Sequence, residues 1–214
     1  MSMQPAVIHV VDDDTSFRTS ISRLLKACSF EVVIHKTAND FLDMPPRSDR
    51  GCILLDVKMP DLDGFEVQNR LSKLGVNLPI VFLTGHGDIA TGVRAIKAGA
   101  EDFLPKPVTK ADLLDAIRRA LLRYDDVHQR NSQLAAFRSL VATLTPRERE
   151  VFTWVVRGKL NKQIAHEMGT SERTVKAHRQ SMMLKLRAKS FAEVVSIAER
   201  LGLVAEANGP GPAL

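Results

Sequence analysis

The chain has 214 residues, a length that allows one or two domains, each able to bury a hydrophobic core. Residues 1–124 hold 16 lysines and arginines against 16 acidic residues, whereas residues 125–214 hold 14 against 9, so the basic excess lies in the C-terminal part and indicates a polyanionic partner. The apolar run from Ala6 to Val11 is too short to span a bilayer and follows no cationic segment, which predicts a cytoplasmic protein without a membrane partner. Cys28 and Cys52 lack metal-ligand spacing, and we expect both to be reduced thiols.

Short apolar runs alternate with amphipathic segments over the first 123 residues. The runs are AVIHVV, EVVIH, CILLD, PIVFLT and DFLP, and a helical pattern follows each of them. After the first run, Asp14 or Thr15 can cap a helix with Phe17, Ile21 and Leu24 on one face. The alternation is typical of βα units. It predicts an α/β domain built on a doubly wound, five-stranded parallel sheet of strand order 2-1-3-4-5.

The last helix of this domain is expected to start near Thr109 and to continue past Arg123, because residues 124–144 contain no glycine or proline. Leu134, Phe137 and Val141 recur there at helical spacing, which indicates a helical connector. Whether it packs on its own domain or on a partner helix is open at this point. The predicted organisation is a first domain over residues 1–123, a helical linker over 124–143, a second domain over 144–204 and a flexible tail over 205–214.

Reactive side chains stand at the ends of four predicted strands. Asp12 and Asp13 follow the first strand, Asp56 the third, Thr84 the fourth and Lys106 the fifth. The carboxyl ends of strands 1 and 3 form the ligand-binding crevice of such a sheet, so we expect these groups to converge. Three clustered carboxylates repel one another and recruit a cation, and oxygen ligands favour Mg²⁺ or Mn²⁺. Together with a hydroxyl and an ammonium, they can accept a phosphoryl group.

The stretches VVDDD, LLDVKMPDLDG, FLTGHGD and DFLPKP resemble the receiver domain of bacterial response regulators, and the GHGD and PKP segments are most similar to the FixJ-like group. The resemblance covers residues 5–123 and implies a CheY-like fold in which Asp56 is the phosphoacceptor. It implies that Asp13, Asp56 and the Lys58 carbonyl bind Mg²⁺, with Asp12 assisting through water. It also implies a phosphoryl contact from Lys106, a switch hydroxyl on Thr84 and a cis Lys106-Pro107 peptide. Phe103 stands where many receivers carry a switch tyrosine.

A phosphatase of the haloacid-dehalogenase type is the enzyme alternative. Asp12 would be the nucleophile of its D-x-D motif, Thr84 would end a second strand, and Lys97 or Lys106 with Asp102 would complete the set. Against this reading, an amphipathic helix begins at Thr15 and leaves no room for the flap of such enzymes, and Asp56 would have no role. A phosphorylation-independent DNA-binding protein is the other alternative.

The basic second half has the pattern of a helix-turn-helix. Residues 161–169 read as a short helix ended by glycine, and Ser171 can cap a second helix that runs to about Leu186. Val175, Met182 and Leu186 form its predicted buried stripe, so that the opposite side can face a major groove. Residues 157–189 hold 9 basic and 2 acidic side chains, which suits phosphate contacts.

TPRERE and NKQIAHEMGTSERTVKAHRQSMMLKL resemble the NarL/LuxR-type output module, which implies an all-α, four-helix domain over about Leu144 to Leu203. The side of the second helix that is expected to face the groove carries Arg173, Lys176, Ala177 and Gln180. The resemblance implies that Lys176, Ala177 and Gln180 approach base edges, and that the residues nearer phosphates are Asn161, Lys162, Thr174, His178, Arg179 and Lys185. Together the two resemblances predict a transcriptional response regulator that is phosphorylated by a sensor histidine kinase and is no enzyme beyond its own phosphorylation and dephosphorylation. We expect phosphorylation to form a homodimer through the helix bearing Val93 and Lys97 and the last strand. Expected partners are DNA, the kinase and a second copy, with RNA polymerase as a further candidate.

Overall fold

The computed structural model describes residues 5–46, 50–85 and 89–204. The predicted tail and residues 86–88, which belong to the GHGD motif, lie outside these ranges. The chain divides into two compact units between His128 and Gln129, a position inside the predicted linker. Within the described ranges, no helix combines the length and the hydrophobicity that crossing a bilayer requires.

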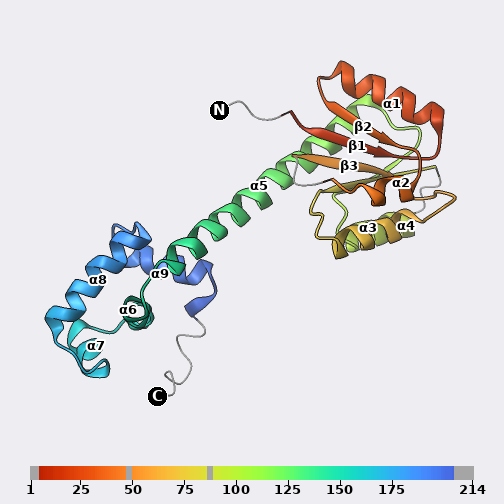
Figure 1. Ribbon diagram of the computed structural model, residues 1–214. Coiled ribbons are helices and arrows are strands. Elements are labelled where there is room, and N and C mark those ends of the chain that lie inside the picture. Colours follow the sequence, from red (N-terminus) through yellow and green to blue (C-terminus); the bar gives the residue numbers. More distant parts are fainter. Residues whose placement is uncertain (1–4, 47–49, 86–88, 205–214) are drawn as a thin grey trace. The chain divides into compact units, whose positions relative to one another are not determined.

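The first unit alternates strands and helices along the chain (Figure 1). Its elements are β1 (Val7–Val11), α1 (Thr15–Ala27), β2 (Glu31–His35), α2 (Ala38–Asp43), β3 (Gly51–Asp56), α3 (Gly64–Lys73), β4 (Ile80–Thr84), α4 (Ile89–Lys97), β5 (Asp102–Pro105) and α5 (Lys110–Ala142). Helix α5 belongs to both units, because the division falls within it. Asp14 caps α1 by accepting hydrogen bonds from two backbone N–H groups of its first turn.

The five strands form one parallel sheet in the order β2-β1-β3-β4-β5. Helices α1 and α5 cover one face of this sheet, and α2, α3 and α4 cover the other (Figure 1). The predicted doubly wound fold and its strand order are therefore confirmed. In the register, Val11 of β1 lies beside Leu55 of β3, and Thr84 of β4 lies beside Pro105 of β5. The carboxyl ends of these four strands thus lie at one edge of the sheet.

The second unit contains four further helices, which are α6 (Pro146–Val156), α7 (Asn161–Glu167), α8 (Glu172–Leu186) and α9 (Phe191–Arg200). Thr145 and Glu148 close a capping box at the start of α6, and Ser171 caps α8. The core of this unit lies between the four helices, and Phe137 and Val141 near the end of α5 pack against it. The end of the connector is therefore part of this unit's packing.

Candidate functional site

Three carboxylates meet at the carboxyl edge of the sheet. One oxygen each from Asp12, Asp13 and Asp56 lies within 4.8 Å of the other two. Asp12 is fully buried and Asp56 is 6 % exposed, whereas Asp13 is exposed. The strand order causes this meeting, because β1 and β3 are neighbours although Asp12 and Asp56 are far apart in sequence. An acidic cluster with one open side can admit a cation or a charged substrate.

Lys106 bridges two of these acids. Its Nζ lies 2.6 Å from Asp12 Oδ2 and 3.1 Å from Asp56 Oδ2. The ammonium also lies 4.4 Å from the centroid of the Phe17 ring on α1, a favourable cation–π position. The peptide between Lys106 and Pro107 is cis, as the resemblance implied. Lys106 is thus held in place by three groups, which come from the residue after β1, from β3 and from α1.

Burial and charge shift the pKa values of Asp56 and Lys106, whose charged groups lie 3.1 Å apart, in different ways. Burial raises the pKa of the Asp56 carboxyl above its ordinary value of 3.8; Lys106 and the Lys58 backbone N–H oppose this shift, and the charge of Asp12 adds to it. Burial by itself would lower the pKa of Lys106, but its hydrogen bond and charge interactions with Asp12 and Asp56 outweigh burial, so that its pKa is raised. Lys106 therefore stays an ammonium, while Asp56 is less acidic than an exposed aspartate.

Thr84 and Phe103 connect this edge to helix α4. Thr84 ends β4 and is 2 % exposed, and its carbonyl accepts a hydrogen bond from the Lys106 backbone N–H at 2.7 Å. Phe103 on β5 is half-buried, and its ring would lie only 3.2 Å from a Cβ built on Gly92 of α4. A displacement of the Phe103 ring would therefore change its packing against α4. Val93 and Lys97 are exposed on the same helix.

Two residues of this site were missed in the sequence. Arg18 is 5 % exposed, and its guanidinium donates to the Asp12 carbonyl and to Thr15 Oγ1. A cation three residues before Ile21 on an apolar helix stripe was the available signal. Gly64 lets α3 approach the third strand, because a Cβ there would lie 2.5 Å from the Asp56 carbonyl oxygen. Both residues fix the backbone that carries the acids.

The two cysteines are free in the structure. Cys28 follows α1 and is half-buried, whereas Cys52 is buried in β3, where burial raises the pKa of its thiol to about 12. Cys52 is therefore a protonated core residue, consistent with the expected absence of a disulfide.

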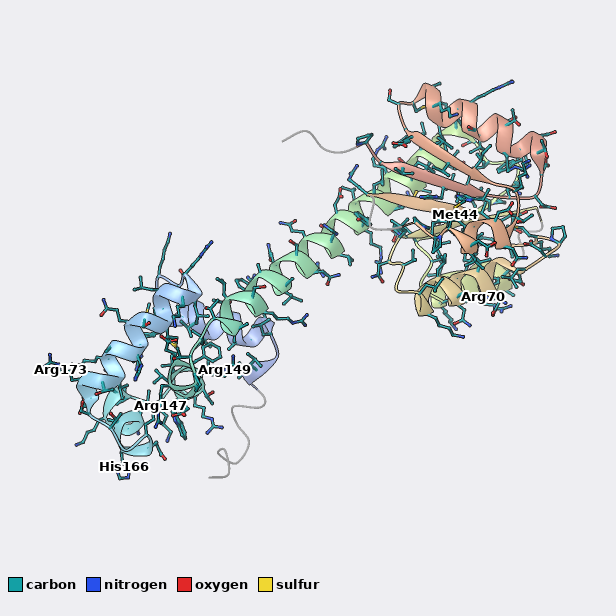
Figure 2. The ribbon with its side chains drawn as sticks, viewed as in Figure 1. Met44, Arg70, Arg147, Arg149, His166 and Arg173 are labelled. Carbon is teal, nitrogen blue, oxygen red and sulfur yellow. The ribbon has the colours of Figure 1, made fainter. Side chains whose placement is uncertain are left out.

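In the second unit, α7 and α8 form two helices joined by a tight turn. Gly169 in this turn has a φ of +59°, a left-handed conformation that favours glycine. Val175, Met182 and Leu186 are buried, which confirms the predicted stripe of α8. Figure 2 shows Arg173 projecting from the first turn of α8. The remaining candidates divide by exposure: Lys162, Thr174, Lys176, Ala177 and Gln180 are exposed, and Asn161, His178, Arg179 and Lys185 are half-buried.

Two of the half-buried cations have protein partners. Lys185 Nζ lies 2.6 Å from Glu148 Oε2, and Arg179 Nη1 donates to Asn161 Oδ1 at 2.6 Å. Glu148 also completes the capping box of α6, and its place on the buried stripe of α6 with Val151 is the sequence signal for a further role. The hydrogen bonds from Lys185 and then Ser181 lower the pKa of Glu148 to about 2, so the carboxylate is ionised throughout the neutral range.

Comparison with known proteins assigns both units. Residues 8–118 match the family model of the response regulator receiver domain, and residues 142–198 match that of bacterial regulatory proteins of the luxR family. Nodulation protein W of Bradyrhizobium diazoefficiens is 41% identical over 200 residues, which cover 94% of this chain and 88% of that protein. Transcriptional regulatory protein FixJ of Azorhizobium caulinodans is 38% identical over 96% of this chain and 97% of its own length. Among solved structures, the response regulator StyR is 41% identical, with a TM-score of 0.83 over 92% of this chain and 99% of that one.

Proposed function

The chain belongs to the response regulators that join a receiver domain to a LuxR-type DNA-binding domain, and we propose that phosphorylation of Asp56 by a sensor histidine kinase controls its binding to DNA. It is a transcriptional response regulator. The observation that carries the proposal is the position of Asp56 beside Asp12, Asp13 and Lys106. Asp12 also lies beside these acids and Lys106, but it is fully buried, whereas Asp56 keeps 6 % of its surface exposed.

The chemistry follows from these neighbours. An Asp56 carboxylate oxygen attacks the phosphorus of a phosphohistidine, the P–N bond breaks, and the imidazole keeps the electron pair and takes up a proton. Lys106 neutralises negative charge on the transferred group, because its ammonium already lies 3.1 Å from the accepting carboxylate. Asp56 must be ionised to attack, and the positive charge of Lys106 favours the ionised form against the effect of burial.

A divalent cation fits the donor set of this site. The donors are oxygens only, they lie within 4.8 Å of one another, and Asp13 keeps one side open to water, as suits Mg²⁺ or Mn²⁺. Asp13, Asp56 and the Lys58 carbonyl would hold the ion directly, and Asp12 would act through water. When bound, the ion supplies positive charge against the phosphoryl oxygens. Asp12 meanwhile holds the Lys106 ammonium at 2.6 Å.

The response to phosphorylation is proposed to pass through Thr84 and Phe103 to α4. A phosphoryl group on Asp56 adds strong acceptors that draw the Thr84 hydroxyl inward, and the vacated space admits the Phe103 ring. Because this ring packs against Gly92, its movement reshapes the exposed surface with Val93 and Lys97. Packing alone makes the step bistable, so a hydroxyl on residue 103 is not required. Receivers then pair through α4 and β5.

Pairing brings two output domains onto two half-sites of DNA. The exposed side chains Lys176, Ala177 and Gln180 would read base edges, with Arg173 beside them. Asn161, Lys162, Thr174 and His178 would contact phosphates, and the basic excess of this half supports such contacts. Linking the two domains raises affinity through effective concentration without a new base contact.

The test is to find which aspartate carries the label from a radioactive acyl phosphate. We expect Mg²⁺-dependent label on the peptide that contains Asp56, and its loss in Asp56→Asn but not in Asp126→Asn, an exposed acid of α5. Label on Asp12 would instead support the phosphatase alternative and overturn the proposal. Two observations weigh against that alternative. Helix α1 begins at Thr15, directly after Asp14, where the flap of such a phosphatase would have to follow. Asp102, which would belong to its catalytic set, forms an ion pair with Arg119.

A further inference from the structure

Helix α8 presents its base-reading residues on the side opposite its buried stripe. At 100° per residue, Val175, Met182 and Leu186 fall within about 40° of one another around the helix axis. Lys176, Ala177 and Gln180 fall on the far side and are exposed. Apolar contact is non-directional, so the stripe by itself fixes the rotation of α8 about its axis only loosely.

A buried carboxylate holds one flank of the stripe. Glu148 of α6 is 4 % exposed and accepts hydrogen bonds from Ser181 Oγ and Lys185 Nζ, both at 2.6 Å. These donors are four residues apart and therefore lie on one line along α8. The same carboxylate accepts the Thr145 backbone N–H at 2.8 Å. Glu148 thus ties α8 to the junction between α5 and α6.

A guanidinium holds the other flank. Arg179 donates from Nη1 to Asn161 Oδ1 in the first turn of α7, at 2.6 Å, and its Cζ lies 3.9 Å from the centroid of the Phe191 ring of α9. Arg179 therefore touches α7 and α9 at once. On a helical wheel, Glu148's partners and Arg179 lie on opposite sides of the stripe, so a rotation of α8 in either direction strains one of the two contacts.

We propose that Glu148 and Arg179 are positioning residues that fix the rotation of α8, and that sequence discrimination depends on them although neither reads a base. This inference rests on the proposed DNA-binding function. A rotation of about 20° would move a side chain about 5–6 Å from the helix axis by about 2 Å. Hydrogen bonds to base edges tolerate far less displacement, whereas attraction to phosphates falls off slowly with distance. We call the Glu148 contacts and the Arg179 contacts the two clamps of α8. Loss of a clamp therefore weakens specific binding more than non-specific binding.

This role differs from the predicted phosphate contacts of Lys185 and Arg179. A phosphate contact contributes to every DNA sequence alike, and its loss reduces the slope of log affinity against log salt by about 0.9. A clamp leaves this slope unchanged and lowers the ratio of specific to non-specific affinity. Arg179→Lys separates the two roles, because lysine keeps the charge but loses the planar fork and the stacking on Phe191.

The experiment uses the full chain and a duplex selected from random DNA by the wild-type protein in the presence of acyl phosphate and Mg²⁺. Affinities for this duplex and for a scrambled one are measured over a range of salt concentrations. We expect Glu148→Gln, Lys185→Met and Arg179→Lys each to lower the affinity ratio about tenfold, with the salt slope unchanged. Glu199→Gln, which changes the same charge at an exposed site on α9, should keep the wild-type ratio. The double variant Glu148→Gln with Lys185→Met should lower the affinity ratio no further than the more impaired of the two single variants, because both substitutions remove the same Glu148–Lys185 contact.

Other outcomes are distinguishable. A variant that is merely less folded loses affinity for both duplexes by the same factor, because only the active fraction falls; that result, or an unchanged ratio, overturns the clamp. A reduced salt slope in Lys185→Met, or an unchanged ratio together with an unchanged slope in Arg179→Lys, would assign that residue to phosphate binding instead. Failure of the wild-type protein to enrich any sequence would overturn the proposed function itself.

Discussion

At Asp56, burial and the charge of Lys106 oppose each other on one carboxylate. The folded protein keeps this acid 6 % exposed and beside Asp12, so the raised pKa reflects an environment that disfavours a second negative charge. Such a site is less stable without a divalent cation to balance its negative charge. Function at this residue is therefore expected to cost stability.

This cost in stability depends on pH. Since the folded-state pKa of Asp56 lies above the ordinary 3.8, the folded protein binds this proton more tightly, and stability falls as the pH rises through the folded-state pKa. In EDTA at pH 8, Asp56→Asn should raise the Tm of the receiver transition by about 3–6 °C, the effect of about 1 kcal/mol on a domain of this size. Scanning calorimetry should show the gain shrinking to nothing near pH 4. Asp126→Asn is the control, and a lower Tm at pH 8 would contradict the expectation.

At the scale of elements, α6 carries a polar residue inside its apolar stripe. Glu148 shares this stripe with Val151 and Val155, yet its buried carboxylate is satisfied by three donors from α8 and from its own helix start. A buried charge with full partners stabilises a fold only while it stays ionised. The packing of α6 on α8 is therefore expected to weaken at acid pH, when Glu148 is protonated.

The stability of the second unit should therefore depend on pH. The fluorescence of Trp154, the single tryptophan, can follow its unfolding, because this residue lies in α6. The folded-state pKa of about 2 lies below the ordinary 4.5, so the stabilisation is complete above pH 4.5 and is lost as the pH falls toward 2. Near pH 6, Glu148→Gln should lower the urea midpoint of Trp154 fluorescence by roughly 1 M. The gap to wild type should close between pH 4.5 and 2. A gap that stays constant over this range would mean that Glu148 is not the titrating group, and Glu199→Gln should show no gap at any pH.

At the scale of the whole molecule, α5 is one continuous helix that contributes residues to both units. Its last turns pack into the output core through Phe137 and Val141, while Val127 is exposed. The connector thus adds a second surface that could pair two copies, besides α4. Substitutions on the two helices can separate these routes.

Phosphorylation should raise the dimer population and operator affinity together. With acyl phosphate and Mg²⁺, we expect sedimentation to show dimers and affinity for a two-half-site duplex to rise about 100-fold, through effective concentration. Val93→Asp should accept label normally yet stay monomeric and bind like the unphosphorylated protein. Val127→Asp, an equally exposed change on α5, should behave like wild type; if it alone blocks dimers, pairing runs through the connector. Equal affinity of labelled and unlabelled protein would favour phosphorylation-independent binding.

The sequence by itself determined the features that local pattern and motif order carry. Alternating apolar runs with acids at their ends predicted the parallel sheet and the convergence of Asp12 and Asp56, because parallel strands align their carboxyl ends. Helical periodicity likewise predicted the buried stripe of α8. Which partners the polar side chains choose was decided only by the tertiary structure. Lys106 across Asp12 and Asp56, Glu148 with Lys185, and Arg179 with Asn161 join residues 94, 37 and 18 positions apart. Such pairs depend on how strands and helices pack against each other, and periodicity within one element contains no information about that geometry.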